Sequence, residues 1–99
     1  MLLYNTTFAI DSEIESEVID WIKTRFMPSA INEDYFSSPQ LFKVMSADND
    51  VISLAVHLYC ESPRHIEHWY ADRGSRLFSE AIERWNQKCV FFSTTLVCL

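Results

Sequence analysis

Glycine and proline are scarce in this chain, whose 99 residues include one glycine and three prolines. Flexible linkers are rich in these residues, so the sequence predicts one continuous domain, residues 1–99. Long apolar runs are also lacking, because no stretch approaches the roughly 18 apolar residues that a transmembrane helix needs. Hydrophobic residues nevertheless make up 48% of the chain, which excludes a disordered protein and is enough for one core.

Cysteine occurs only three times, and no Cys-x-x-Cys pair is present. Small secreted domains usually carry an even number of cysteines that form a disulfide framework. The first residues, from Met1 to Thr6, contain no basic segment followed by an apolar run, so no secretory signal is expected. We therefore expect a cytoplasmic protein with free thiols at Cys60, Cys89 and Cys98.

Positive charge is in the minority, with eight Lys and Arg residues against 14 Asp and Glu residues and a net charge of −6. This balance argues against nucleic acid and against an anionic membrane as partners. The sequence also contains no glycine-rich phosphate loop, no serine nucleophile elbow and no basic and aromatic RNA-binding pattern. It predicts no cofactor, and it leaves open whether the protein is an enzyme.

Four segments have the composition or the alternation that is typical of β-strands. They are residues 2–10, 40–47, 51–60 and 89–97. The third is the clearest, because large apolar residues alternate with other residues along its length. We expect the Ser-Ser-Pro segment at 37–39 to form a loop and the Asp-Asn-Asp segment at 48–50 to form a tight turn.

Two further segments have apolar residues at helical spacing. The first begins with a capping-box pattern at residues 12–15, and Pro28 is expected to break or kink it before a short turn or helix at 29–36. The second begins at Ser62-Pro63, an N-cap followed by proline in the first turn. We expect Gly74, the only glycine, to separate two helices at 62–72 and 75–86.

The order of these elements is strand, helix, two strands, helix, strand, which matches the split β-α-β arrangement. We therefore predict an α+β fold of the ferredoxin-like βαββαβ type, a four-stranded antiparallel sheet with the helices on one face. The apolar stripes of the helices include Trp21, Trp69 and Trp85, and we assign these residues to the core rather than to a binding site.

The sheet face away from the helices is predicted to be both polar and aromatic. We expect it to carry Asn5, Thr7, Ser53, His57, Tyr59, Phe91, Ser93 and Thr95. This mixture is too aromatic for a solvated sheet surface and too polar for a core. A second copy of the chain would account for both properties, so we predict a homodimer through this face.

The candidate site residues on this face are Asn5, Thr7, His57 and Tyr59, as interface or ligand-binding groups. His57 has the ionisation range of an acid or base, while Asn5 and Tyr59 have groups that orient a substrate. The same polar groups fit a dimer interface in which they bond to one another or to water. We favour the interface.

The densest group of metal-binding residue types is His57, Cys60, His65 and His68. Imidazole and thiolate groups are ligands of zinc. His57 and Cys60 are three residues apart on a strand, however, so their side chains point to opposite faces. Two histidines on one helix turn do not complete a structural site, and we predict no metal.

Five short motifs spread along the chain carry a family resemblance. They are residues 3–7 (LYNTT), 21–28 (WIKTRFMP), 56–62 (VHLYCES), 71–74 (ADRG) and 91–96 (FFSTTL). Together they resemble the bacterial family of domain of unknown function 4286. The resemblance implies a ferredoxin-like fold and pairing as a dimeric α/β barrel, and it transfers no established activity. The family often has His before Ile-Pro where this chain has Phe26, and this difference favours a non-enzymatic role.

Two functions from different classes follow. We favour a homodimeric binding or accessory domain. The alternative is a cofactor-independent enzyme of the dimeric α/β barrel type, a monooxygenase or isomerase acting on a small apolar or aromatic substrate. A cavity of roughly 300 Å³ or more lined by His57 would support the enzyme, whereas a solidly packed sheet face would support the interface. A small-molecule ligand is compatible with both.

Overall fold

The computed structural model describes residues 1–46 and 50–99. Its sheet contains β1 (Leu2–Asp11), β2 (Ser37–Lys43), β3 (Val51–Cys60) and β4 (Cys89–Val97). The first helical region consists of η1 (Ser12–Ile14), α1 (Glu15–Trp21), η2 (Ile22–Phe26) and α2 (Met27–Ala30). The second consists of α3 (Pro63–Trp69), η3 (Tyr70–Gly74), α4 (Ser75–Trp85) and η4 (Asn86–Lys88). The predicted α+β class with a four-stranded antiparallel sheet is confirmed.

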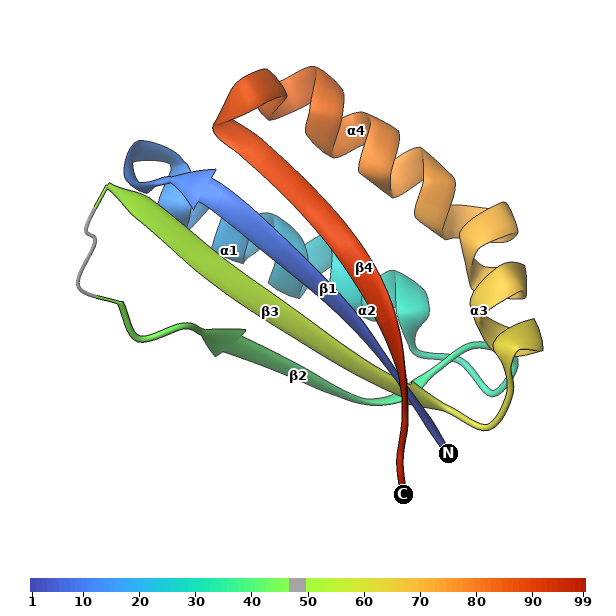
Figure 1. The fold of residues 1–99 in the computed structure, drawn as a ribbon. Helices are drawn as coiled ribbons and strands as arrows, with labels where there is room; N and C mark the ends of the chain where they lie inside the picture. The colour runs from blue at the N-terminus through green and yellow to red at the C-terminus, as the bar shows by residue number, and fades with distance from the viewer. Residues whose placement is uncertain (47–49) are drawn as a thin grey trace.

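The strands lie in the order β2-β3-β1-β4, and every neighbouring pair is antiparallel. Both helical regions lie against the same face of this sheet (Figure 1). That face is buried because alternate residues of the two central strands are large and apolar, including Phe8, Ile10, Leu54 and Leu58. The predicted alternation of the third strand is thus confirmed, and its bounds agree with β3.

The space between sheet and helices is filled mainly by aromatic rings. Phe8 contacts the rings of Trp21 and Phe26 edge to face, with centroid distances of 6.1 and 5.4 Å. The predicted core position of all three tryptophans is confirmed, since Trp21, Trp69 and Trp85 are between 0 and 5% exposed. Edge-to-face contacts of this kind stabilise a core beyond the area that they bury.

Both helical regions contain a π-helical segment, η2 in the first and η3 in the second. The predicted break at Gly74 is wrong, because the chain stays helical from Pro63 to Trp85 with η3 joining α3 to α4. Gly74 has ordinary helical angles, φ −61° and ψ −45°. Its role is close approach: a Cβ there would lie 2.6 Å from the Trp69 ring.

The helix start and the effect of Pro28 also differ from the prediction. Asp11 rather than Ser12 caps the first turn, since the Glu13 N–H donates to Asp11 Oδ1 at 3.1 Å. Pro28 does not end the helix, because it falls in the first turn of α2, directly after the wide turn of η2. A missing N–H is tolerated at such a position. The helical region ends at Ala30, and residues 31–36 form an irregular turn closed by a bridge between Ile31 and Phe36.

The second strand begins earlier than predicted, at Ser37 rather than at residue 40. The segment predicted as a loop is a bulge in which Ser38 takes a φ of 53° and the register shifts between Ser37 and Gln40. Bulges of this kind admit proline, so Pro39 does not stop the strand. The strand ends at Lys43, before the predicted end at 47. Residue 47 and most of the turn predicted at 48–50 lie outside the described residues.

Candidate functional site

The sheet face opposite the helices is called the open face below. The strand register assigns its residues: Leu3, Asn5, Thr7, Ala9, Asp11, Ser37, Gln40, Phe42, Val51, Ser53, Ala55, His57, Tyr59, Val90, Phe92, Thr94 and Leu96. All four predicted site residues, Asn5, Thr7, His57 and Tyr59, lie on this face and are half-buried. Asn5 and His57 are direct cross-strand partners on β1 and β3. The structure thus brings these four side chains to one surface, as the alternation in sequence predicted.

Short polar contacts and one ring contact order these side chains. The Asn5 amide donates to the Thr7 hydroxyl at 3.1 Å, and Tyr59 Oη donates to Gln40 Oε1 at 3.4 Å. The His57 ring lies 4.9 Å from the centroid of the Phe42 ring. Gln40 and Phe42 were not among the predicted site residues, although the register of β2 places them beside His57 and Ala55.

The predicted placement of the last strand is wrong by one residue. Phe91, Ser93 and Thr95 were expected on the open face, but they pair with Phe8, Thr6 and Tyr4 and therefore face the helices. The Thr6 and Ser93 hydroxyls are 2.9 Å apart, and the Phe91 ring stacks on Phe78 at 4.7 Å. A shift of one residue moves every side chain of a strand to the other face. The open face therefore carries Val90, Phe92, Thr94 and Leu96 instead.

With β4 corrected in this way, the open face is more apolar than predicted. Among the paired strand residues that the structure describes, Asp11 at the end of β1 is its one charged side chain. Its rim is formed by large exposed side chains: Phe42 is 46% exposed, Val90 57%, Phe92 60% and Leu96 47%. Its centre is formed by Asn5, Thr7, His57 and Tyr59. An apolar rim around a small polar centre is unusual for a surface that stays in water.

The predicted separation of His57 from Cys60 is confirmed. His57 lies on the open face, whereas Cys60 is 5% exposed on the helix side, where its thiol donates to the Ser62 carbonyl at 3.4 Å. His65 Nδ1 lies 3.3 Å from the Ser62 hydroxyl. Within residues 1–46 and 50–99, no three His, Cys, Asp or Glu side chains are grouped closely enough to hold a metal ion.

The buried thiols are protonated at neutral pH. Burial raises the pKa of Cys60, and it raises the pKa of Cys89 to about 11. Because the thiolate is the reactive form of cysteine, neither side chain is an activated nucleophile.

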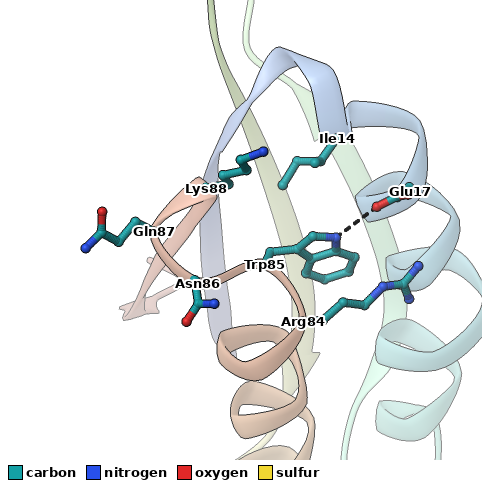
Figure 2. Close-up of a pocket in the computed structure, with 7 residues that line it drawn as sticks. All are labelled: Ile14, Glu17, Arg84, Trp85, Asn86, Gln87 and Lys88. Carbon is teal, nitrogen blue, oxygen red and sulfur yellow. Dashed lines mark hydrogen bonds between the residues drawn. The ribbon is translucent and has the colours of Figure 1, made fainter.

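Four cavities bounded by described residues have volumes between about 130 and 650 Å³, and His57 lines none of these four. One of about 650 Å³ lies where α4 meets α1 (Figure 2). There the Trp85 indole N–H donates to Glu17 Oε2 at 3.1 Å, and the Arg84 guanidinium lies 4.7 Å from the centre of the Trp85 rings. Lys88 pairs with Glu13 across the same gap, and this contact raises the pKa of the lysine. These polar groups tie the end of α4 to the start of the first helical region.

Asn86, at the edge of this cavity, has an unfavourable backbone conformation, with φ 49° and ψ −129°. Residues other than glycine lose about 1–3 kcal/mol in such regions. We expect Asn86→Gly to raise the free energy of unfolding by about 1 kcal/mol, after the greater flexibility of glycine in the unfolded chain is subtracted. Urea denaturation measures this change. Asn86→Ala serves as the control, and equal stability of the two variants would contradict the assignment of strain.

None of the helices in the described part of the chain is long and apolar enough to cross a membrane.

Comparisons with known proteins agree with this architecture. No curated protein matches the chain. Among solved structures, a de novo designed protein, Foldit4, is similar with a TM-score of 0.63 and 11% sequence identity, over 99% of this chain and 98% of the designed one. At this identity the likeness concerns the fold alone.

A family model extends over almost the whole sequence. The model described as domain of unknown function (DUF4286) matches residues 1–98. The match covers every strand and helix of the structure, including the open face and both π-helical segments. The chain therefore belongs to the DUF4286 family.

Proposed function

We propose that this chain is a ferredoxin-like binding or accessory domain that works as a homodimer, with the open faces of two copies packed against each other. The observation that carries the proposal is the scarcity of charge on the open face of a chain with a net charge of −6, since Asp11 at the end of β1 is the one charged side chain among its described strand residues. Two acidic chains repel each other less when the surfaces that meet carry little charge. The order of the strands, β2-β3-β1-β4, supports the ferredoxin-like assignment.

The size of the open face fits a stable dimer. Four strands at a spacing of about 4.8 Å and about nine residues long at roughly 3.3 Å per residue give a face of about 600 Å². Two such faces bury about 1,200 Å² in total, which is at the lower end of the range for specific interfaces. Packed sheets lie about 10 Å apart, so the rings of Phe42 and Phe92 have room to interdigitate with those of the other copy.

A second copy is the occupant that this surface fits best. In a two-fold dimer the same patch meets itself, so the apolar side chains at the rim of one copy meet those of the other. Asn5 and His57 lie on the two central strands, where they are available to pair with polar groups of the second copy. In this arrangement the polar groups at the centre determine how the two copies are aligned with each other.

The dimer is tested by the mass of the protein in solution. Light scattering at tens of micromolar is expected to give about twice the chain mass of 11.6 kDa. Phe92→Glu is expected to convert the dimer to a monomer, because the new charge would be buried without a partner. Phe92 is 60% exposed in the single chain, so this change leaves the monomer folded.

Ile82→Glu is the matched control. Ile82 is 52% exposed on α4, on the helix side of the sheet, where it shares a cavity of about 350 Å³ with Phe92 at the β4 edge, and its substitution adds the same charge beside the open face rather than on it. It is expected to leave the mass of the dimer unchanged. A monomeric wild-type protein, or an equal effect of the two variants, would refute the proposal. Thr94→Glu repeats the test at a second open-face position should Phe92→Glu lose its circular dichroism spectrum.

The free thiols of Cys60, Cys89 and Cys98 support a cytoplasmic location, since disulfides are rare in reducing compartments. The alternative function as a cofactor-independent enzyme has no comparable support among the described residues. The four cavities given above do not include His57, and the His57 ring packs on Phe42 instead.

A further inference from the structure

Three of the eight basic residues of this acidic chain meet around one cavity. The cavity has a volume of about 250 Å³ and is lined by Arg25, Ser29, Arg73, Arg76 and Leu77. We call it the arginine cavity. No acidic side chain lines it. All three arginines are exposed, and guanidinium groups gathered in this way give the cavity a positive potential that favours an anionic ligand.

Neighbouring groups hold two of the three arginines in place. Arg25 Nη2 lies 2.7 Å from Glu80 Oε2, and the other oxygen of Glu80 accepts a bond from the Trp21 indole at 3.0 Å. The hydrogen bond from Arg25 has the largest effect and the one from Trp21 the next largest. Together they lower the pKa of Glu80, so this carboxylate stays charged.

Arg73 is held from the other side of the cavity. Its Nη1 donates to the Ser29 carbonyl at 3.1 Å, and its guanidinium lies 5.2 Å from the centre of the Tyr35 ring. The Tyr35 hydroxyl in turn donates to Asp72 at 2.7 Å, and this bond is the main reason why the pKa of Tyr35 is raised. Asp72 therefore belongs to the support of Arg73 rather than to the cavity wall.

Arg76 differs from the other two. Over residues 1–46 and 50–99 it has no hydrogen-bond or ion-pair partner, although it shares the cavity with Arg25 and Arg73. The Ser29 hydroxyl does not satisfy it, because that hydroxyl donates to the Phe26 carbonyl and accepts from the Trp69 indole. The cavity thus offers the N–H donors of Arg76 together with those of two arginines that are already positioned.

The backbone gives an independent indication of a site here. Arg25 lies in the π-helical segment η2 and Arg73 in the π-helical segment η3, so the cavity lies where both segments meet. π-Helical turns are rare and are found frequently at functional sites. Two of them lie on opposite sides of one cavity, and each supplies an arginine to its lining.

We propose that the arginine cavity binds the phosphate group of a small phosphomonoester. Of the three guanidinium charges, one is paired with Glu80, so two positive charges remain. Two positive charges match the charge of a phosphomonoester dianion, whereas a carboxylate carries only one negative charge. Guanidinium groups bind phosphate oxygens through paired N–H donors. A volume of about 250 Å³ is below the range of whole-ligand pockets, and it suits a phosphate group whose organic part extends outward past Leu77.

The test uses amide spectra of the ¹⁵N-labelled full chain. Inorganic phosphate, methyl phosphate and acetate are titrated at constant ionic strength and about pH 7.5, where the phosphate is mainly a dianion. Both phosphates are expected to shift amide signals around residues 25, 29 and 73–77 in a saturable manner, and acetate is expected to bind at least about tenfold more weakly because it makes fewer charged hydrogen bonds.

Variants separate a built site from general attraction to positive charge. Arg76→Gln is expected to weaken phosphate binding about tenfold or more, whereas Arg84→Gln, which removes the same charge at the Trp85 cavity, is expected to change it less than twofold. Binding of acetate as tight as that of phosphate would overturn the assignment of a dianion. If inorganic phosphate bound and methyl phosphate did not, the assignment of a phosphate ester as the ligand would be wrong. Equal effects of the two variants, or no saturable shifts, would overturn the site itself.

The oligomeric state distinguishes this inference from the proposed function. The arginine cavity lies among the helices, whereas the proposed dimer uses the opposite face of the sheet (Figure 1). Phe92→Glu is therefore expected to bind methyl phosphate like the wild type even as a monomer. Loss of phosphate binding in this folded monomer would contradict the placement of the site within one chain.

Discussion

Phe8→Ala is expected to lower the free energy of unfolding by about 3–5 kcal/mol, the range for removal of a fully buried aromatic ring. Phe8 lies on the central strand β1 and is 0% exposed. Its ring contacts Trp21, Phe26 and Phe91, at centroid distances between 5.4 and 6.1 Å. The lost ring leaves a cavity between sheet and helices that these stiff neighbours cannot fill.

Urea denaturation at one fixed protein concentration measures this loss, with the fluorescence of the buried tryptophans as the signal. A fixed concentration matters because self-association makes stability depend on the amount of protein. Ile82→Ala is the control, and it is expected to change stability by less than about 0.5 kcal/mol because Ile82 is half exposed on α4. A loss below about 1.5 kcal/mol for Phe8→Ala would show that the aromatic core repacks.

Gly74→Ala is expected to destabilise the protein by about 2 kcal/mol, although alanine is the better helix former by about 1 kcal/mol. The new Cβ would lie between 2.6 and 2.9 Å from three carbons of the Trp69 ring. Trp69 is 0% exposed, its ring touches Tyr4, Phe26, Phe36 and Phe78, and its indole donates to Ser29. It therefore has nowhere to move, so overpacking costs about 3 kcal/mol, the upper part of the usual range.

A double-mutant cycle isolates this cause. In a Trp69→Leu background the same Gly74→Ala change is expected to be neutral or to stabilise by up to about 1 kcal/mol, because the smaller side chain leaves room for the Cβ. Ser75→Ala, one residue along the same helix, is expected to change stability by less than about 0.5 kcal/mol. A loss that persists in the Trp69→Leu background would mean that Gly74 is required for some reason other than the Trp69 ring.

The sequence by itself determined the features that depend on local periodicity. Alternation along 51–60 and the composition of 2–10 and 89–97 located β3, β1 and β4 to within a residue, because a strand presents its side chains to two faces in turn. The same alternation placed Asn5, Thr7, His57 and Tyr59 on one surface. Helical spacing placed the three tryptophans in the core for the same reason.

Local patterns were insufficient where a second segment decides the outcome. Phe91 and Phe92 are adjacent and equally apolar, so only the pairing of β4 with β1 determines which of them is buried. The bulge at Ser38 likewise depends on the pairing of β2 with β3. Gly74 was expected to break the helix because glycine is a poor helix former, and its actual function depends on the Trp69 ring five residues earlier, across the wide turn of η3.

The arginine cavity depends entirely on tertiary structure. Arg25 is about fifty residues from Arg73 and Arg76 in the sequence, so no single segment contains all three. Only the packing of the two helical regions against the same sheet face brings the three side chains together. The sequence thus determined which faces exist, because periodicity is a property of one segment. The tertiary structure decided which residues meet on them, because register and helix packing are properties of segment pairs.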